Sequence, residues 1–495
     1  LKEDVAVGNA LIDMYCKFGL LAKAQNVFDE LPFRDTISWN TLIGGYTFHG
    51  HANKSLNCFD QMKMEGLRPD SVTFIHTLKA CGCVGATEKG QEICVEIADM
   101  KLLEGDPVLA STVIDMYANC GLFVEAKELL CDIPAQDAIS WTALIAGYAQ
   151  EGQGLEALNC FKQMHCEGVL PNSVTLVCTL KACGSARSLK QGQEIHAKIC
   201  IQGLLIKDVI VGNALIDMYG KCGVVTEAHE VFDMLLERDT ISWNALIIGY
   251  AEQNHITEVL KLFSRMPSEG ILPDSVTYIT ILRVVGDFAI NCVRELHMKI
   301  SEMGFLDRDP FIGNTLVDTY ANCRLLLEAQ EVFEMLPMHD VVSWNIMITG
   351  CARHGLDGEV IKCFRQMEDE GVNPDAITYA CILKSCGIVG SLEVGEDINT
   401  KIRKQGLLQK NVVLNTALVD MYSKCGALEK AQEVCEKLLV QDVIPWNALL
   451  TGYCQHGLGQ EALNCFRSMR NKGIRPDVVT YVCVLKASSI VKSIE

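Results

Sequence analysis

Five tryptophans recur at a nearly constant spacing along the 495-residue chain. They are Trp39, Trp141, Trp243, Trp344 and Trp446, so the gaps are 102, 102, 101 and 102 residues. Each lies in a related phrase, such as Ile-Ser-Trp-Asn-Thr-Leu-Ile at 37–43. A fixed period of this kind predicts a repeat array. The repeat therefore indicates one continuous array rather than the roughly three domains that length alone would suggest.

Each block of about 102 residues divides into three segments in a fixed order. We call them S units (31 residues, as in 5–35), P units (35 residues with the Trp, as in 36–70) and L units (36 residues, as in 71–106). The L unit of the third block, 275–309, is one residue shorter. We count 14 complete units over 5–477 and a fifteenth, cut short, over 478–495. We expect residues 1–495 to form one array without a separate catalytic domain.

Each unit is predicted to contain two helices. In 36–70, Trp39, Leu42, Ile43 and Tyr46 follow the i, i+3, i+4, i+7 spacing of one helix face. The sequence His-Gly-His at 49–51 interrupts this pattern, and a second apolar stripe follows over 56–62. Stacked helix pairs bury these stripes jointly. We therefore expect an all-α fold, a right-handed superhelical α-solenoid of helix-turn-helix repeats, with the tryptophans in its core.

Composition agrees with a soluble solenoid. Hydrophobic residues make up 49% of the chain, but no run approaches the ~18 consecutive apolar residues of a membrane-spanning helix. We therefore expect no membrane association. The first four residues, 1–4, show no signal or transit peptide.

The 24 cysteines follow the repeat rather than a metal-binding pattern. Cys58, Cys160, Cys363 and Cys465 are equivalent positions, and no Cys-x-x-Cys occurs anywhere. A zinc site needs clustered ligands at short spacing, whereas a free cysteine behaves as a small hydrophobic residue. We expect no metal, no cofactor and no disulfide framework, and a reducing compartment.

No arrangement of residues indicates catalysis. His49, His354 and His456 share one turn before a glycine, which is typical of a turn residue rather than a ligand. The chain has no phosphate-binding glycine loop and no recognisable Ser/His/Asp or Cys/His set. We expect neither an enzyme nor a small-molecule substrate.

The fifth residue of every S and P unit is a short polar one. Asn, Ser and Thr are mediocre helix formers, and a solvated site would drift toward Lys or Glu. In L units the same place is apolar. This restriction suggests a surface that reads a ligand. The ten residues are Asn9, Asn40, Ser111, Thr142, Asn213, Asn244, Asn314, Asn345, Thr416 and Asn447.

The last residue of every unit is Asp or Asn. One interpretation is a helix N-cap for the following unit, since these side chains accept hydrogen bonds from free N–H groups. The other is a functional pairing with the fifth residue, and the two remain open. In the S and P units these residues are Asp35, Asp70, Asp137, Asn172, Asp239, Asp274, Asp340, Asp375, Asp442 and Asp477.

The chain resembles the pentatricopeptide repeat family, in particular its plant subclass that cycles long, short and standard repeats. The resemblance is carried by Ser-Trp-Asn-Ala-Leu-Ile-Ile-Gly-Tyr at 242–250 and Gly-Asn-Ala-Leu-Ile-Asp-Met-Tyr-Gly-Lys-Cys-Gly at 212–223. It covers essentially all 495 residues. It implies binding of single-stranded RNA at one base per repeat, with the fifth residue bonding the base edge and the last residue supporting it.

The resemblance also gives a role to the second residue, which is expected to wedge between neighbouring bases. Ordinary packing at a helix start is the alternative. The residues are Ala6, Ile37, Val108, Ile139, Ile210, Ile241, Phe311, Val342, Val413 and Ile444.

The pairing rules of the family convert these residues into an expected RNA site. Asn with Asp favours U, Thr or Ser with Asp favours G, and Thr with Asn favours A. L units, with an apolar fifth residue, are written n. Reading from the N-terminus at the 5′ end gives 5′-UUnGAnUUnUUnGUn-3′.

The net charge of the chain is the opposite of what an electrostatic interface with RNA would favour. The formal net charge is −19, although RNA binders usually carry a basic footprint. At the thirteenth position, where family members can contact phosphate, Lys17, Lys221, Arg353 and Lys424 are candidates. We expect a small phosphate contribution and a shallow salt dependence.

Two questions stay open at this stage. A protein-binding scaffold of the tetratricopeptide kind would suit the acidic surface, but does not account for the fifth residues. The family resemblance further implies C-to-U editing in mitochondria or chloroplasts, with a deaminase domain either missing from this chain or acting in trans, and with editing-complex proteins as partners. RNA stabilisation, processing or splicing is the alternative.

Overall fold

The computed structural model describes residues 4–104, 106–132, 138–286, 290–409, 411–437 and 442–494. Within these ranges all regular elements are helices, which confirms the predicted all-α class. The chain comprises two compact bodies, Leu1–Leu272 and Pro273–Glu495.

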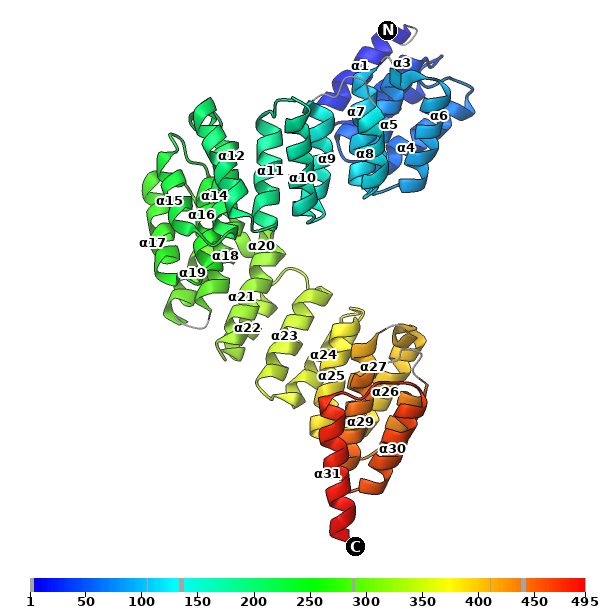
Figure 1. The fold of residues 1–495 in the computed structure, drawn as a ribbon, viewed down its shortest axis with the longest axis vertical. Coiled ribbons are helices and arrows are strands. Elements are labelled where there is room, and N and C mark those ends of the chain that lie inside the picture. Colours follow the sequence, from blue (N-terminus) through cyan, green and yellow to red (C-terminus); the bar gives the residue numbers. More distant parts are fainter. Residues whose placement is uncertain are drawn as a thin grey trace. The chain divides into compact units, whose positions relative to one another are not determined.

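In the N-terminal body, the first helices of successive units pack against one another (Figure 1), and each also packs against the second helix of its own unit. The first helices are α1 (Val5–Lys17), α3 (Thr36–Phe48), α5 (Ser71–Val84), α7 (Pro107–Asn119), α9 (Ala138–Gln150), α11 (Ser173–Ser185), α14 (Val209–Lys221) and α16 (Thr240–Glu252). The second helices are α2 (Leu21–Asp29), α4 (Ala52–Met64), α6 (Thr87–Asp99), α8 (Phe123–Asp132), α10 (Gly154–Cys166), α12 (Leu189–Gln202), α15 (Val225–Met234) and α17 (Ile256–Arg265).

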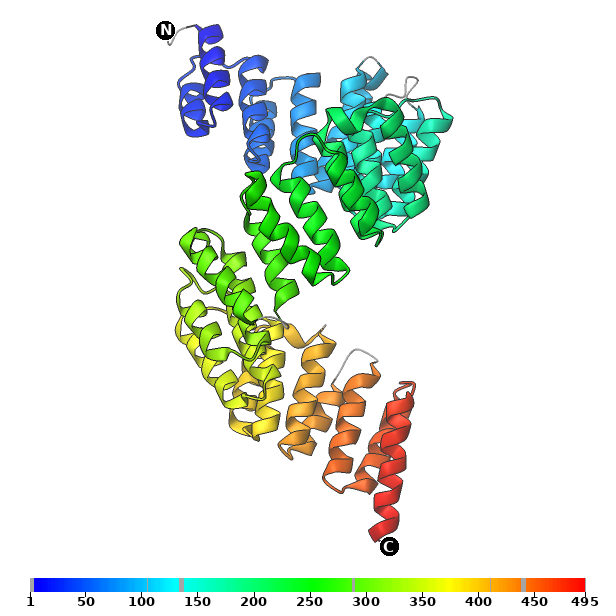
Figure 2. The same cartoon turned by 90° about the vertical axis from the view of Figure 1, so that its left-hand side faces the viewer.

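The C-terminal body repeats this arrangement (Figure 2). Its first helices are α18 (Ser275–Val285), α21 (Pro310–Asn322), α23 (Val341–Arg353), α25 (Ala376–Val389), α27 (Val412–Lys424), α29 (Val443–Gln455) and α31 (Val478–Ile494). Its second helices are α19 (Ile290–Glu302), α22 (Leu326–Glu334), α24 (Asp357–Asp369), α26 (Leu392–Lys404), α28 (Leu428–Glu436) and α30 (Gly459–Asn471).

The L units depart from the predicted pair of helices. Each complete L unit adds a short third helix before its last residue: η1 (Leu102–Glu104), α13 (Leu204–Lys207), α20 (Phe305–Arg308) and η3 (Leu407–Gln409). Glycines with positive φ, at Gly203, Gly304 and Gly406, end the preceding helix. The residues between this glycine and the end of the L unit are numerous enough to form one more helical turn. In one P unit, η2 (Met266–Glu269) follows α17 in a similar way.

Where the structure describes it, the last residue of a unit lies at the start of the next first helix. Asp35 accepts a hydrogen bond from the Ser38 N–H at 2.8 Å, and the Ser38 hydroxyl bonds back to Asp35 to complete a capping box. The same box forms at Asp70, Asn172, Asp239, Asp274, Asp340 and Asp375. The N-cap interpretation of these residues is therefore confirmed, at roughly 1 kcal/mol per cap.

The tryptophans lie in the core, as predicted. Their exposed fractions are between 0 and 3%. Phe28 of an S unit meets Trp39 of the following P unit edge to face, with ring centroids 4.6 Å apart. Phe232 and Trp243 repeat this contact at 4.8 Å, and Phe333 and Trp344 at 4.7 Å. The core therefore runs from one unit to the next, as a solenoid requires.

Several cysteines lie in the core, and a histidine joins two successive units. Cys81, Cys183 and Cys386 are buried free thiols. Burial raises the pKa of Cys386 to about 11, so it stays protonated. His49 Nε2 donates to the Cys16 carbonyl of the preceding S unit at 2.5 Å. In the described part of the chain, no group of three potential ligands is placed to hold a metal ion.

No helix in the described ranges is both long and apolar enough to cross a bilayer.

Candidate nucleic-acid interface

The first helices present residues 2, 5, 9 and 13 of each unit on one face, because these spacings approximate the helical period. Pockets open on this face in both bodies. One, of about 710 Å³, is lined by residues that include Ile37, Asn40, Asp70 and Val72. Another, of about 450 Å³, includes Phe311, Asn314 and Val342. Each pocket is thus lined by a fifth residue together with the second residues of its own unit and the next.

The second residues form an exposed apolar row. Ile37 is 62% exposed, Ile241 64% and Phe311 74%. The other predicted wedge residues are exposed as well: Ala6, Val108, Ile139, Ile210, Val342, Val413 and Ile444. Burial in the helix–helix core does not account for them. Large apolar side chains left in water at a regular spacing are instead suited to contact flat aromatic rings.

The fifth-position asparagines bond to the last residue of their own unit in five pairs. These amides are largely buried; Asn40, for example, is 9% exposed. In each pair the Asn Nδ2 donates to the Asp carboxylate. The distances are 3.2 Å for Asn9–Asp35, 2.9 Å for Asn40–Asp70, 3.1 Å for Asn213–Asp239, 3.1 Å for Asn345–Asp375 and 3.0 Å for Asn447–Asp477. N-capping and pairing with the fifth residue are thus functions of the same carboxylate.

The other predicted pairs behave differently. Thr142 reaches Asn172 only through Thr175, whose Oγ1 is 2.6 Å from Thr142 Oγ1. The hydroxyls of Ser111 and Thr416 donate to carbonyls within their own helices. Among the described residues, no hydrogen bond joins Asn314 to Asp340 or Thr416 to Asp442. Asp137 lies outside the described residues.

The remaining predicted pair divides between the two bodies. Asn244 belongs to the N-terminal body and Asp274 to the C-terminal body.

A threonine that sequence reasoning missed distinguishes P units from S units. The third residue of the L unit that follows a P unit donates to the asparagine Oδ1. Thr73 does so to Asn40, Thr378 to Asn345 and Thr480 to Asn447, each at 2.6 Å. In the S units, Oδ1 of Asn9, Asn213 and Asn314 is buried without a hydrogen-bond partner. The third residue of the P unit that follows each S unit is Ser or Pro instead of Thr. This alternation between Thr and Ser or Pro can be read from the sequence.

Hydrogen bonds keep the paired carboxylates ionised. Burial raises the pKa of Asp70, but hydrogen bonds from the Thr73 N–H, the Asn40 amide and the Thr73 hydroxyl outweigh it and hold this pKa below its ordinary value. The pKa values of Asp35, Asp239 and Asp375 are lowered in the same way. A permanently charged carboxylate fixes the orientation of the amide, because it can only accept.

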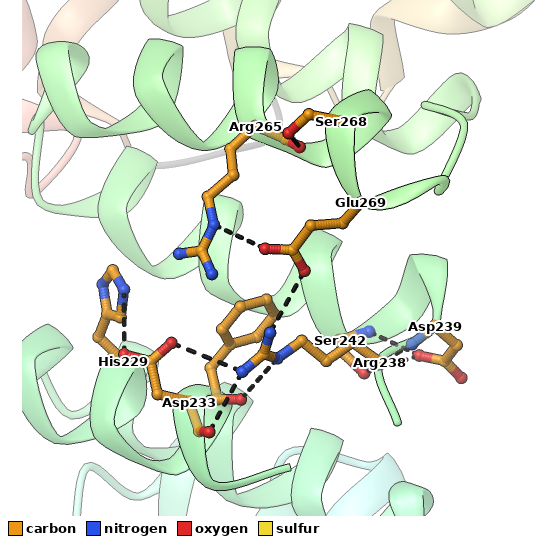
Figure 3. Close-up of polar contacts among 9 residues, drawn as sticks. His229, Asp233, Arg238, Asp239, Ser242, Arg265, Ser268 and Glu269 are labelled. Carbon is orange, nitrogen blue, oxygen red and sulfur yellow. Dashed lines mark hydrogen bonds and ion pairs between the residues drawn. The ribbon is translucent and has the colours of Figure 1, made fainter. Parts of the chain in front are cut away.

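In two S units, the arginine before the last residue anchors the turn that carries the carboxylate, as Figure 3 shows for Arg238. Arg238, which directly precedes Asp239 in the chain, donates to the Phe232 carbonyl at 3.0 Å and pairs with Glu269 at 3.2 Å. The Asp239–Ser242 capping bond lies beside it in the same view. Arg34 makes the equivalent contacts before Asp35.

All four predicted phosphate contacts are paired with acidic residues. Lys17, Lys221 and Lys424 bond to the aspartate one helical turn earlier, at 2.6, 2.7 and 2.7 Å. Arg353 contacts Asp318 at 3.5 Å and also bonds to Asn322. Such exposed ion pairs are weak, about 0–1 kcal/mol. They nevertheless partly neutralise the positive charge of the side chains that were predicted to bind phosphate.

The fold and this surface define the protein class as an α-solenoid with a repeated polar and apolar row along its first helices. Models of pentatricopeptide repeats match the sequence. The PPR repeat family matches residues 34–83, 136–185, 238–286, 339–387 and 441–489. The PPR repeat matches 9–35, 108–135, 213–240 and 416–443.

Known proteins are similar over nearly the whole chain. The mitochondrial pentatricopeptide repeat-containing protein At3g53360 of Arabidopsis thaliana is 34% identical over 100% of this chain and 64% of its own length. The chloroplastic relative At4g18520 of the same plant is 31% identical over 97% of this chain and 77% of its own length. This chain therefore belongs to the pentatricopeptide repeat family.

A solved structure shares the fold. The pentatricopeptide repeat protein PPR10, in complex with an 18-nt psaJ RNA element, is 19% identical with a TM-score of 0.51, covering 98% of this chain and 81% of its own. The chain spans 56 to 62% of the length of several other curated Arabidopsis relatives.

Proposed function

We propose that this chain binds single-stranded RNA and that its S and P units each read one base. The observation that carries the proposal is the repeated Asn–Asp pair set between exposed apolar second residues, as at Asn40 and Asp70 between Ile37 and Val72. An amide held by a carboxylate presents a fixed hydrogen-bonding group, and single-stranded bases expose matching edges. PPR10, a family member of the same fold, was solved with RNA.

The pairing rules implied by the family give 5′-UUnGAnUUnUUnGUn-3′ as the site, with the chain's N-terminus at the 5′ end. The five hydrogen-bonded Asn–Asp pairs support the U assignments opposite Asn9, Asn40, Asn213, Asn345 and Asn447. We assign the repeats to the plant subclass that cycles long, short and standard units, in one array over 1–495.

We propose an organellar role in selecting sites for C-to-U editing, with the deamination supplied by another domain or by a deaminase in trans. Relatives named as mitochondrial and chloroplastic support an organellar location in general. The editing step follows the subclass assignment.

Equilibrium binding to the 15-mer tests the proposal. We expect tighter binding to this sequence than to a shuffled RNA of the same composition, and weaker binding to the DNA version. Equal affinity for the shuffled RNA would contradict the proposal that the S and P units each read one base. Absence of RNA binding even at low salt would favour a protein-binding scaffold instead.

A further inference from the structure

A row of cations runs through the L units at their ninth residue. It consists of Lys79, Lys181, Arg283, Lys384 and Lys486, on α5, α11, α18, α25 and α31. Every L unit, including the incomplete last one, carries such a residue, and all five are exposed. The ninth residue of each S unit is instead aspartate, and P units have no charge there.

These cations differ from the thirteenth-position ones in their partners. Lys17, Lys221 and Lys424 each form an ion pair with an aspartate one turn away. Within the described part of the chain, none of the five L-unit cations has an acidic oxygen within 4.0 Å, the limit for an ion pair. These cations therefore form no direct ion pair, although the charge of Lys79 opposes the burial that raises the pKa of Asp115, and Asp318 lines the same pocket as Arg283.

The L-unit cations lie on the face that carries the reading residues. Position nine follows position five by one helical turn, so both point the same way. Arg283 lines the pocket that contains Asn314, Phe311 and Val342. Lys486 lines a pocket of about 540 Å³ with Val479, the second residue of its unit.

The L units also lack a group that could read a base edge. Their fifth residues are Ile75, Val177, Ile279, Ala380 and Val482. An L unit thus combines an apolar residue where a base would be read with an unpaired cation one turn further along.

We infer that the L units hold the RNA backbone, each through a phosphate bound to its ninth-position cation, while the S and P units read bases. This inference rests on the proposed function, because it requires RNA on this face. It places positive charge once per three units along the interface, even though the chain carries a net charge of −19. For single strands, each neutralised phosphate contributes about −0.7 to the slope of log affinity against log salt concentration.

The test compares two triple variants of the full chain. The first, K79Q/K181Q/K384Q, removes three L-unit cations from first helices. The control, K162Q/K190Q/K404Q, removes three exposed lysines from the second helices α10, α12 and α26, none of which contributes to the two pockets that hold Asn40 and Asn314. Both variants lose the same charge. Affinity for the 15-mer and for its single-base variants is measured across a salt series.

We expect the first variant to lower the magnitude of the salt slope by about 2. Its affinity should fall equally for matched and mismatched RNA, so that base discrimination is unchanged. The control should leave the slope as in the unmodified chain. Equal slope changes in both variants, or no change in the first, would overturn the inference.

Failure of the proposed function looks different in the same experiment. In that case the unmodified chain would not distinguish the 15-mer from shuffled RNA, or would not bind RNA. If the unmodified chain shows base preference and a slope that K79Q/K181Q/K384Q does not alter, only the inference about L units fails.

Discussion

The S and P units place a short polar residue at position five, whereas the L units place an apolar residue at five and a cation at nine. Both sets use the same face of their first helices. The second residue, exposed and apolar in both, does not differ; Ile37 is 62% exposed and Val174 59%. Under the proposed roles, one helical face divides base reading and backbone binding among the repeat types.

The largest expected effect comes from removing one reading amide. Asn213→Ala deletes the side chain that Asp239 orients. Losing one hydrogen bond of about 1 kcal/mol should weaken binding to the 15-mer about five- to tenfold and abolish the preference for U at that base. The measurement is a titration with the four RNAs that vary this position.

The matched substitution in an L unit is Val177→Ala, also at position five. It should change affinity less than twofold for any base, because no polar contact is lost. Thermal melts followed by circular dichroism establish that both variants fold. If Val177→Ala removed base preference as strongly as Asn213→Ala, the distinction between unit types would fail.

A smaller effect separates P units from S units. Asn345 is held by both Asp375 and Thr378, whereas Asn213 is held by Asp239 alone. A better pre-organised group loses less entropy on binding. We therefore expect Thr378→Val to reduce discrimination at the base opposite Asn345 by about two- to fivefold, toward the level of the S units. Competition between U and C at that base reports the change.

Ser242→Ala is the control for this variant. It also removes a capping-box hydroxyl, but Ser242 does not bond to the Asn213 Oδ1, which has no partner. Base discrimination opposite Asn213 should stay the same. A comparable loss in both variants would mean that the helix cap, and not the amide anchor, determines discrimination.

The smallest expected effect is on stability at low pH. The folded-state pKa of Asp375 is lowered: burial raises it, but hydrogen bonds from the Thr378 N–H and the Asn345 amide prevail. Such a group stabilises the fold above its unfolded pKa of about 3.9 and loses this contribution as the pH falls through the folded value. Asp375→Asn still caps the helix, as Asn172 does, but no longer titrates.

Urea unfolding midpoints measured from pH 6 to pH 3 test this point. The variant should lose less stability than the unmodified chain below about pH 4. Identical pH profiles would show that the paired carboxylate contributes nothing specific.

The fold could be predicted from the sequence because its information is local and repeated. The spacing of Trp39, Leu42 and Tyr46 indicates a helix face, and the 102-residue period places the same face in each block. The third helix of L units was missed, since a four-residue helix such as α13 has too few residues to show a period.

Only part of the candidate site could be predicted from the sequence. The polar fifth residues stand out as exceptions inside apolar phrases, and the last residues as an invariant Asp or Asn. The partners of Lys17 and Lys221 did not stand out, because a thirteenth-position cation is interpretable only together with the aspartate at position nine. Nor did Thr73, since it bonds to Asn40 33 residues earlier, in another unit.

The most direct test of the reading assignment is an exchange of one pair. Thr142→Asn with Asn172→Asp converts the fifth unit to the Asn–Asp combination found at Asn345 and Asp375. Both proteins are titrated with the 15-mer carrying either A or U as its fifth base. The account predicts that the unmodified chain prefers A and the double variant prefers U, each by about tenfold. Affinity that ignores this base in both proteins would contradict it.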